Sequence, residues 1–230
     1  VGSNVREIFL DDGILAAAAP GTVMIDSSTI DVGSAQAVHE AAKSSGFNMI
    51  DAPVSGGVIG ADAGTLTFMC GGDKESFEKA KPILQGMGKN IVHCGSGGLG
   101  QATKICNNML AGINALAAAE AMTMGERLGV SPDILYEVIS TSTGRSYIFE
   151  TSNPMPDVCS TSPANNKFKP GFMAKLMLKD LRLSQSAAQD AKTSTPLGAA
   201  ATAAFQQLID SGFGDLDTSS IIKVIKPESK

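Results

Sequence analysis

Residues 91–128 read IVHCGSGGLGQATKICNNMLAGINALAAAEAMTMGERL, and the change of pattern inside this stretch decides the fold. A short strand-like run ends in a glycine cluster at residues 95–100, and one long apolar helical pattern follows up to residue 128. Strands and helices alternate before the cluster, whereas only helical patterns occur after it. We therefore predict two domains: an α/β domain over residues 1–98 and an all-helical domain over residues 99–230.

The first domain shows an alternation that is typical of a parallel or mixed sheet wound with helices. Asp31 and Asp73 stand where helices are expected to begin, and an aspartate at that position can cap the helix. The expected strands are residues 22–26, 48–52, 66–70 and 91–94, and the expected helices are residues 31–45 and 73–84. In the second domain the expected helices are residues 101–128, 132–140, 171–191, 196–211 and 217–225, with an ordered loop at 153–170.

The composition argues against several classes of function. The net charge of the 230 residues is -5 and no stripe of lysine and arginine is present, so nucleic acid is not an expected partner. The most apolar run, residues 109–124, is interrupted by Asn114 and Glu120 and is too short to span a membrane. The four cysteines form no CxxC pair and show no metal-ligand spacing with the two histidines, so we expect reduced thiols and no metal site.

The glycine cluster GSGGLG at residues 95–100 fits the pattern G-x-G-x-x-G of dinucleotide-binding loops, and it follows a strand and opens a helix as that pattern requires. However, the dinucleotide loop belongs to a βαβ unit with an acidic residue at the end of its second strand, and no second strand follows here. Glu120 has the right spacing but lies inside the long helix. We therefore interpret the cluster as a flexible domain junction and not as the phosphate loop.

Two polar clusters follow predicted strands, at the carboxyl ends where α/β proteins place their sites. Residues 27–29, Ser-Ser-Thr, offer three hydroxyls that either cap the next helix or bind a ligand. Residues 51–57, DAPVSGG, end in Ser-Gly-Gly, where backbone N–H groups can approach a carboxylate or phosphate without interference from Cβ atoms. The alternative for the second cluster is a tight turn without a ligand.

Two predicted helices carry polar groups that need an explanation. Gln101, Lys104 and Asn108 are spaced three and four residues apart, so they share one face of the long helix. Burial disfavours a charged ammonium group, which suits Lys104 to general acid–base chemistry unless its side chain only extends to water. Lys179 belongs to an amphipathic helix at residues 172–183, for which a solvated charged face is the simpler interpretation.

Three motifs, in this order, resemble those of the β-hydroxyacid dehydrogenase family: DAPVSGG at 51–57, GQATKICNNML at 100–110 and LKDLRL at 178–183. Residues 153–156 (NPMP) and 162–166 (SPANN) resemble an insertion in the branch of that family that acts on 3-hydroxyisobutyrate. The resemblance implies a truncated Rossmann-like NAD-binding domain followed by a helical substrate and dimerisation domain. It also implies NAD-dependent oxidation of 3-hydroxyisobutyrate to methylmalonate semialdehyde, a step of valine catabolism.

The resemblance further implies roles for individual residues. Lys104 matches the catalytic lysine of the family, the general acid/base that acts on the reacting oxygen. The residues that match substrate contacts are Ser55, Gly56, Gly57 and Asn108. Those that match cofactor contacts are Thr29, Lys179 and, in a looser alignment, Asn4.

The family begins with a strand and a G-x-G-x-x-G turn that holds the pyrophosphate, and we expect this part to precede Val1. Because NAD and NADP are distinguished largely in that part, NAD is an expectation from the family. Two alternatives stay open. One is a related reductase of tartronate semialdehyde, succinic semialdehyde or glyoxylate, and the other is a non-catalytic helical core that only oligomerises.

The expected partners are a small 3-hydroxy acid and further copies of the chain. The long apolar helix favours a homodimer or homotetramer, since one small domain rarely covers such a helix completely. The resemblance implies the mitochondrial matrix for a eukaryotic source and the cytoplasm otherwise, and it does not suggest secretion.

Overall fold

The computed structural model describes residues 1–11 and 13–227. They form two compact units, the first over residues 1–106 and the second from residue 107 onward. The first unit holds a mixed sheet with helices, and the second is helical, which confirms the predicted α/β plus all-α architecture. We predicted the boundary near residue 98, within the glycine cluster, whereas the compact units divide inside helix α6 (Leu99–Arg127).

The first unit opens with short helical segments that the sequence pattern did not predict. These are α1 (Gly2–Arg6), a π-helical turn (Glu7–Asp11) and α2 (Ile14–Ala17). The following elements are β1 (Val23–Asp26), α3 (Val32–Ser44), β2 (Asn48–Asp51), β3 (Val54–Ser55), α4 (Gly57–Asp62), β4 (Leu66–Gly71), α5 (Lys74–Gln85) and β5 (Gly88–Gly95). The four predicted strands are present, whereas β3 and α4 are too short to produce a readable period.

Both predicted aspartate caps of the first unit are confirmed. The Asp31 side chain accepts a hydrogen bond from the Ser34 N–H at 2.7 Å and begins α3. The Asp73 side chain accepts one from the Ser76 N–H at 2.8 Å and begins α5. Each carboxylate satisfies a backbone donor that has no partner within the helix.

The sheet has the strand order β1-β2-β4-β3, and β5 pairs with β4. β1 and β2 are parallel, as are β4 and β5, while β4 runs antiparallel to β2 and β3. The sheet is therefore mixed, which is one of the two arrangements, parallel or mixed, that the sequence predicted. The register of β1 and β2 aligns Asp26 with Asp51, so an aspartate ends each of these neighbouring strands at the same edge.

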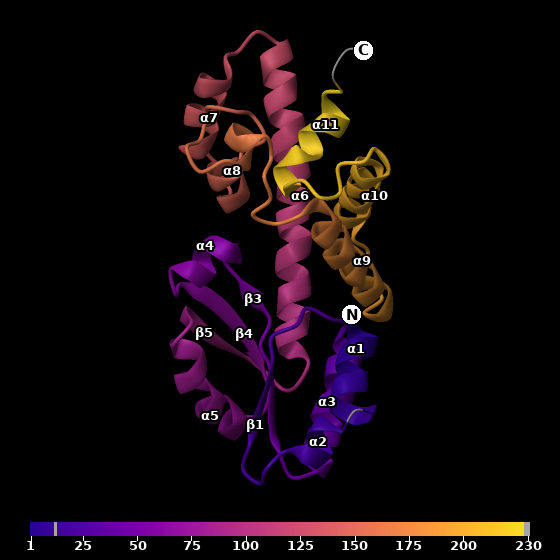
Figure 1. Ribbon diagram of the computed structural model, residues 1–230. Coiled ribbons are helices and arrows are strands. Elements are labelled where there is room, and N and C mark those ends of the chain that lie inside the picture. Colours follow the sequence, from indigo (N-terminus) through magenta and orange to yellow (C-terminus); the bar gives the residue numbers. More distant parts are fainter. Residues whose placement is uncertain (12, 228–230) are drawn as a thin grey trace. The chain divides into compact units, whose positions relative to one another are not determined.

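Alternating side chains of the strands fill the cores on the two faces of the sheet. Met24 and Met49 pack with Val38 of α3, whereas Ile50 packs with Phe77 of α5. Figure 1 shows α5 on one side of the sheet and α1 to α3 on the other. Since helices cover both faces, the central strands read in the sequence as continuous apolar runs.

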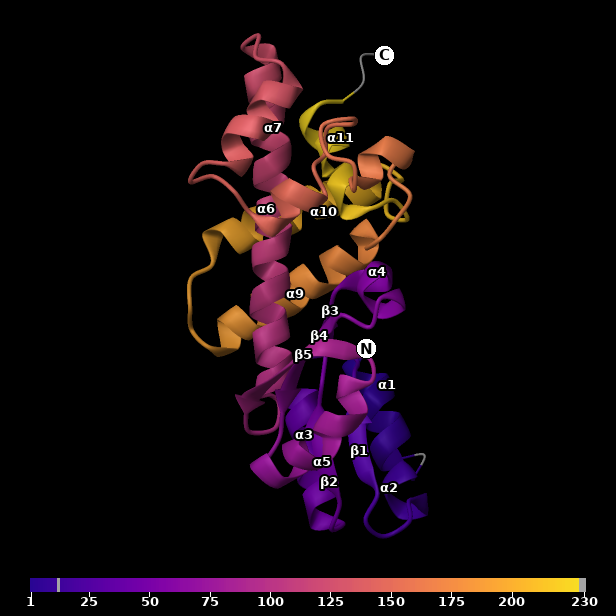
Figure 2. The ribbon, with the colours of Figure 1, turned by 90° about the vertical axis from the view of Figure 1, so that its left-hand side faces the viewer.

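The second unit is built along the C-terminal part of α6. Its further elements are α7 (Pro132–Ser140), α8 (Tyr147–Thr151), a 3-10 turn (Pro163–Asn166), α9 (Ala174–Asp190), α10 (Pro196–Asp210), a second 3-10 turn (Thr218–Ile221) and α11 (Ile222–Ile225). Helix α9 crosses α6 (Figure 2). At the crossing, a Cβ added to Gly112 would lie 2.9 Å from Leu181 Cδ2 and 3.1 Å from Met177 Sδ, so glycine permits this close approach.

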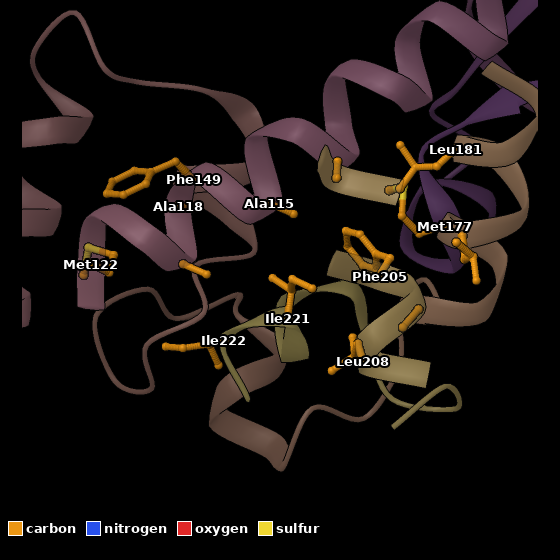
Figure 3. Packing of buried hydrophobic residues seen from close by; sticks show 14 of the residues in the cluster. Ala115, Ala118, Met122, Phe149, Met177, Leu181, Phe205, Leu208, Ile221 and Ile222 are labelled. Carbon is orange, nitrogen blue, oxygen red and sulfur yellow. The ribbon is translucent and has the colours of Figure 1, made fainter. Parts of the chain in front are cut away.

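The buried apolar side chains of the second unit form a large hydrophobic core. Ala115, Ala118 and Met122 of α6 belong to this core together with Phe205 and Leu208 of α10, and side chains from α8, α9 and α11 complete it (Figure 3). Helix α6 is apolar on several faces because different helices of this unit pack on different sides of it. Not every side is covered, since Leu110 and Met124 are exposed.

Two predicted helix bounds differ from the structure because of one buried carboxylate. Asp217 Oδ2 accepts hydrogen bonds from the backbone N–H groups of Gly171 and Phe172, both at 3.0 Å, so helix α9 begins only at Ala174. Asp217 Oδ1 accepts from the Ser219 N–H at 2.9 Å. The segment after it forms a 3-10 turn before the short α11, in place of the single helix predicted for residues 217–225.

The loop predicted at residues 153–170 is ordered by its own side chains. Asn153 is fully buried, and its Nδ2 donates to the Phe149 carbonyl at 3.2 Å while its Oδ1 accepts from the Met155 N–H at 3.1 Å. The Ser162 hydroxyl donates to the Asn153 carbonyl. The predicted ordered loop is thus confirmed, with a 3-10 turn inside it.

Candidate active site

The edge of the sheet where β1 and β2 end is organised by the buried carboxylate of Asp51. Its Oδ1 accepts from the Gly98 N–H at 2.8 Å and its Oδ2 from the Gln101 N–H at 2.9 Å. His39 Nε2 lies 2.8 Å from the same Oδ1. A carboxylate at this position satisfies donors at the start of α6 and interacts favourably with the positive end of the helix dipole.

The protein's own residues occupy the N–H groups and the space around the glycine cluster at the start of α6. The Gly98 N–H, which a phosphate loop would direct at a ligand, donates to Asp51. A Cβ on Gly97 would lie 2.4 Å from the His39 ring, and one on Gly100 would lie 2.3 Å from the Met69 carbonyl oxygen. The cluster therefore does not act as a phosphate loop, as the sequence analysis concluded, but it is a tightly packed turn and not a loose junction.

The Gln101 side chain holds the loop that contains Thr29. Gln101 is fully buried, its Nε2 donates to the Ser28 carbonyl at 2.8 Å, and its Oε1 accepts from the Ile30 N–H at 3.1 Å. Thr29 lies between these two anchored residues and is partly exposed. The loop after β1 and the first turn of α6 are therefore locked together.

Lys104 follows one turn after Gln101 on α6. Only 8 % of the residue is exposed, although most lysines lie on the surface. The three predicted features of this unit, Lys104, Thr29 and the loop after β2, thus depend on one set of buried bonds through Asp51 and Gln101.

Ser55, Gly56 and Gly57 form the junction between β3 and α4. Ser55 is partly exposed, and both glycines are exposed with positive φ angles of 134° and 59°. A side chain at Gly56 would meet Leu66 Cδ2 at 3.0 Å. Since the first N–H groups of a helix have no partner within it, this junction can present backbone donors to an anion.

In the second unit, the two remaining site residues meet through Asp180. The Asn108 Nδ2 donates to Asp180 Oδ2 at 2.6 Å, and Lys179 Nζ lies 3.0 Å from Asp180 Oδ1. Asn108 and Asp180 are buried, with 4 % and 3 % exposure. Asn107 Nδ2 donates to Asn108 Oδ1 at 3.0 Å, so the amide of Asn108 is held at both ends.

Two family models match the chain in succession. Residues 1–95 match the NAD binding domain of 6-phosphogluconate dehydrogenase. Residues 98–225, more than half of the chain, match the model described as NAD-binding of NADP-dependent 3-hydroxyisobutyrate dehydrogenase. The chain belongs to the 3-hydroxyisobutyrate dehydrogenase family.

Individual relatives agree with this placement. The chain is 45% identical over 225 residues to the NAD-dependent L-serine dehydrogenase of Pseudomonas aeruginosa, covering 97% of this chain and 76% of the relative. It is 40% identical over 226 residues to the mitochondrial 3-hydroxyisobutyrate dehydrogenase of Mus musculus, covering 98% and 68%. A solved structure of the Mycobacterium tuberculosis 3-hydroxyisobutyrate dehydrogenase with L-serine matches with a TM-score of 0.92 and 45% identity, covering 98% and 76%.

Membership of the 3-hydroxyisobutyrate dehydrogenase family confirms several predictions. The chain is an oxidoreductase of the NAD-dependent hydroxyacid dehydrogenase class, with a Rossmann-like domain followed by a helical domain. The predicted NAD-type cofactor is confirmed. The roles of single residues stay predictions, because the matches do not assign them.

The residues of this family member fit a nucleotide cofactor where the sequence predicted contacts. The loop after β1 offers exposed hydroxyls at Ser27 and Ser28 beside Thr29, and it is kept in place by Gln101. Such donors are suited to the sugar and amide groups of a nicotinamide nucleotide. Asn4 is exposed on α1 and accepts a bond from Ser3 Oγ at 3.3 Å.

The residues that hold the site together were not predicted from the sequence. Asp51 and Asp180 were quoted only as parts of motifs, and Gln101 only as a neighbour of Lys104 on the helix. One signal was available for Asp51, because an aspartate that ends a buried strand requires donors close to it. Which donors these are depends on contacts across almost fifty residues of sequence, as the separation of 47 between Gly98 and Asp51 shows.

Other features of the 3-hydroxyisobutyrate dehydrogenase fold do not add to the site. Two hollows of about 230 and 200 Å³ in the second unit contain none of the predicted site residues. None of the helices within residues 1–11 and 13–227 has the length and hydropathy that a membrane crossing needs. In the same described residues, no three side chains of His, Cys, Asp or Glu gather as a metal site would require, and the four cysteines are free thiols.

Proposed function

We propose that the protein oxidises 3-hydroxyisobutyrate to methylmalonate semialdehyde with NAD as the hydride acceptor. The observation that carries this proposal is the burial of Lys104 on a helix whose start is fixed by Asp51 and Gln101, in a chain of the 3-hydroxyisobutyrate dehydrogenase family. A dehydrogenase needs such a fixed proton-exchanging group, since hydride transfer depends on near-contact geometry.

In the proposed reaction, Lys104 accepts the proton of the substrate hydroxyl while the carbon that bears it loses a hydride. The bound NAD supplies the hydride acceptor. In the reverse direction Lys104 returns the proton to the aldehyde oxygen, so atoms and charges balance in both directions. With only 8 % of Lys104 exposed, bulk water has little access to the proton that it exchanges.

The proposed substrate contacts fix which carbon faces the cofactor. The exposed junction Ser55-Gly56-Gly57 binds the substrate carboxylate through backbone N–H groups and the Ser55 hydroxyl. Asn108 binds the substrate through its oriented amide. The cofactor contacts are proposed for Thr29, Lys179 and Asn4.

L-serine is the second candidate substrate, because the relatives named above include an L-serine dehydrogenase and a structure with L-serine bound. L-serine and 3-hydroxyisobutyrate share the carboxylate and the hydroxymethyl carbon, and they differ by an amino group in place of a methyl group. The contacts proposed for Lys104 and residues 55–57 therefore serve both. Reductases of tartronate semialdehyde, succinic semialdehyde or glyoxylate are further alternatives within the same chemistry.

The test compares these substrates in the protein expressed from its complete gene, with NAD and with NADP. The proposal expects the highest kcat/KM for 3-hydroxyisobutyrate, and a clear preference for L-serine or for a semialdehyde would replace it. Lys104→Ala should lower kcat by at least about 100-fold with little change in melting temperature. Added alkylamines should restore part of the lost rate, and the exposed Lys43→Ala, also on a helix, is the matched control.

Near-normal turnover of Lys104→Ala would refute the catalytic assignment. For assembly and location, we propose a homodimer or homotetramer, which light scattering would measure. We also propose the mitochondrial matrix if the source is eukaryotic, as the name of the mouse relative suggests, and the cytoplasm otherwise.

A further inference from the structure

A buried carboxylate lies between two of the proposed site residues of the second unit. Asp180 on α9 accepts from Asn108 Nδ2 through one oxygen at 2.6 Å and pairs with Lys179 Nζ through the other at 3.0 Å. Asp180 is only 3 % exposed. A buried charge needs both a counter-charge and hydrogen bonds, and these two contacts supply one of each.

The carboxylate decides how the Asn108 amide points. An ionised carboxylate can only accept hydrogen bonds, so the NH₂ end of Asn108 has to face Asp180 and the carbonyl end has to face away. Asn107 Nδ2 donates to that carbonyl oxygen at 3.0 Å and supports the same orientation. One N–H and one lone pair of the Asn108 amide are not used by these two bonds, and their directions follow from the orientation.

The same carboxylate holds Lys179 against α9. The Lys179 side chain is 36% exposed, and its ammonium group lies beside Asp180. The pairing opposes extension of this side chain into water. A second lysine of α9, Lys175, also pairs with an aspartate, Asp215, but that pair is exposed on both sides, with 53% and 84%. Exposed pairs of this kind contribute little to stability, whereas the carboxylate of the Lys179–Asp180 pair is buried and depends on its partners.

We propose that Asp180 is a positioning residue of the dehydrogenase: it orients the Asn108 amide toward the substrate and keeps Lys179 in place for the cofactor. This inference rests on the proposed roles of Asn108 and Lys179. Because Asp180 is only 3 % exposed, the effect proposed for it passes through these two side chains. It is the feature by which the substrate contact and the cofactor contact of this unit depend on each other.

The first test is Asp180→Asn, which keeps the shape of the side chain and removes its charge. The expected result is a loss of about 10- to 100-fold in kcat/KM for the hydroxy acid, with the KM for the hydroxy acid raised, because the hydrogen bond from Asn108 loses its charged acceptor and a neutral amide can also turn its NH₂ end toward Asn108. Asp215→Asn removes the carboxylate that pairs with Lys175 of the same helix, and it should leave kcat and both KM values unchanged.

A double-mutant cycle separates positioning from a general loss of structure. Because Asp180 also holds Lys179, adding Asp180→Asn to Asn108→Ala should still lower kcat/KM, but by a smaller factor than Asp180→Asn does in the wild type. Full additivity of the two losses would overturn the proposal. If Asp180→Asn fails to fold, the exchanged pair Asn108→Asp with Asp180→Asn restores an amide–carboxylate bond; recovery of the fold without recovery of substrate affinity supports positioning, and recovery of both overturns it.

A readout without turnover distinguishes this proposal from the proposed function. The side-chain NH₂ signal of Asn108 in a ¹⁵N NMR spectrum should shift in Asp180→Asn and stay in place in Asp215→Asn. An unchanged Asn108 signal in Asp180→Asn would overturn the positioning role. If the wild-type protein oxidises no hydroxy acid, the proposed function fails, whereas the NMR signal still decides whether Asp180 orients Asn108.

Discussion

Substitution of Asp51 by alanine should destabilise the first unit far more than removal of an ordinary helix cap. Asp51 is fully buried and accepts from the N–H groups of Gly98 and Gln101 and from His39 Nε2, at 2.8 to 2.9 Å. In the variant, the two backbone donors at the start of α6 lose their acceptor in a site that water does not reach. At about 1–3 kcal/mol for each of the two donors left without a partner, the expected loss is about 2–6 kcal/mol.

That loss is a large part of the total stability of a domain, which is about 5–15 kcal/mol. The assay is urea denaturation followed by circular dichroism, with the free energy of unfolding compared between the wild type and each variant. The matched control is Asp73→Ala, because Asp73 caps α5 in a mostly solvated position. It should cost about 1 kcal/mol, the usual value for an aspartate cap.

Asp51→Asn provides an intermediate case. Its amide oxygen still accepts from one N–H group, but its NH₂ end faces the other donor, so the loss should lie between those of the two alanine variants. A loss for Asp51→Ala no greater than that for Asp73→Ala would refute the reasoning, since it would mean that the three bonds to Asp51 are replaced without cost. Turnover should fall as well, because Lys104 follows this helix start by less than two turns.

The remaining predictions concern glycines, thiols and pH. Gly100→Ala should destabilise the fold by about 2 kcal/mol or more, since its Cβ would lie 2.3 Å from a backbone carbonyl oxygen. Gly33→Ala, within α3, should stabilise it by about 0.5–1 kcal/mol, because the added Cβ meets only an Asp31 oxygen at 3.5 Å. Thermal melts of the two variants test both expectations. Burial, with Cys94 nearby, raises the pKa of the Cys70 thiol to about 12. A thiol reagent at mildly alkaline pH should therefore modify exposed Cys106 in the native protein and spare Cys70, and mass spectrometry of digests measures both. Rapid labelling of Cys70 would contradict its burial. Hydrogen bonds from Ser76, first from its backbone N–H, hold the pKa of Asp73 below its usual value. This cap therefore stabilises the fold at neutral pH, and its contribution is lost as the pH falls through the folded-state pKa. The melting temperatures of the wild type and Asp73→Ala should converge in strong acid.

The sequence by itself determined the class of the fold, and it predicted where the chemistry takes place. Apolar runs of four to five residues next to capped helices predicted the strands, and the caps at Asp31 and Asp73 were found where they were expected. These features are local, because a cap or a strand pattern depends on neighbours within a few residues. The motifs around Lys104 and residues 51–57 were likewise visible, the first as a lysine on an apolar helix and the second as Ser-Gly-Gly after a predicted strand.

Local patterns failed where an element is short or where its bounds depend on distant residues. The two-residue strand β3 and the short helices α1, α2, α4 and α8 contain too few residues to show a period. The start of α9 could not be predicted, since Asp217 takes the N–H groups of Gly171 and Phe172 from more than forty positions away.

Only the tertiary structure decided how the candidate site is held. The sequence shows that Asp51, Gln101 and Asp180 are polar, but it does not show that they are buried or which donors and acceptors they meet. Those partners lie 47 to 73 positions away in the contacts between Asp51 and α6, between Gln101 and the loop after β1, and between Asn108 and Asp180. The physical reason is the cost of burying a polar group without a partner, which fixes these pairs only once the chain has brought them together.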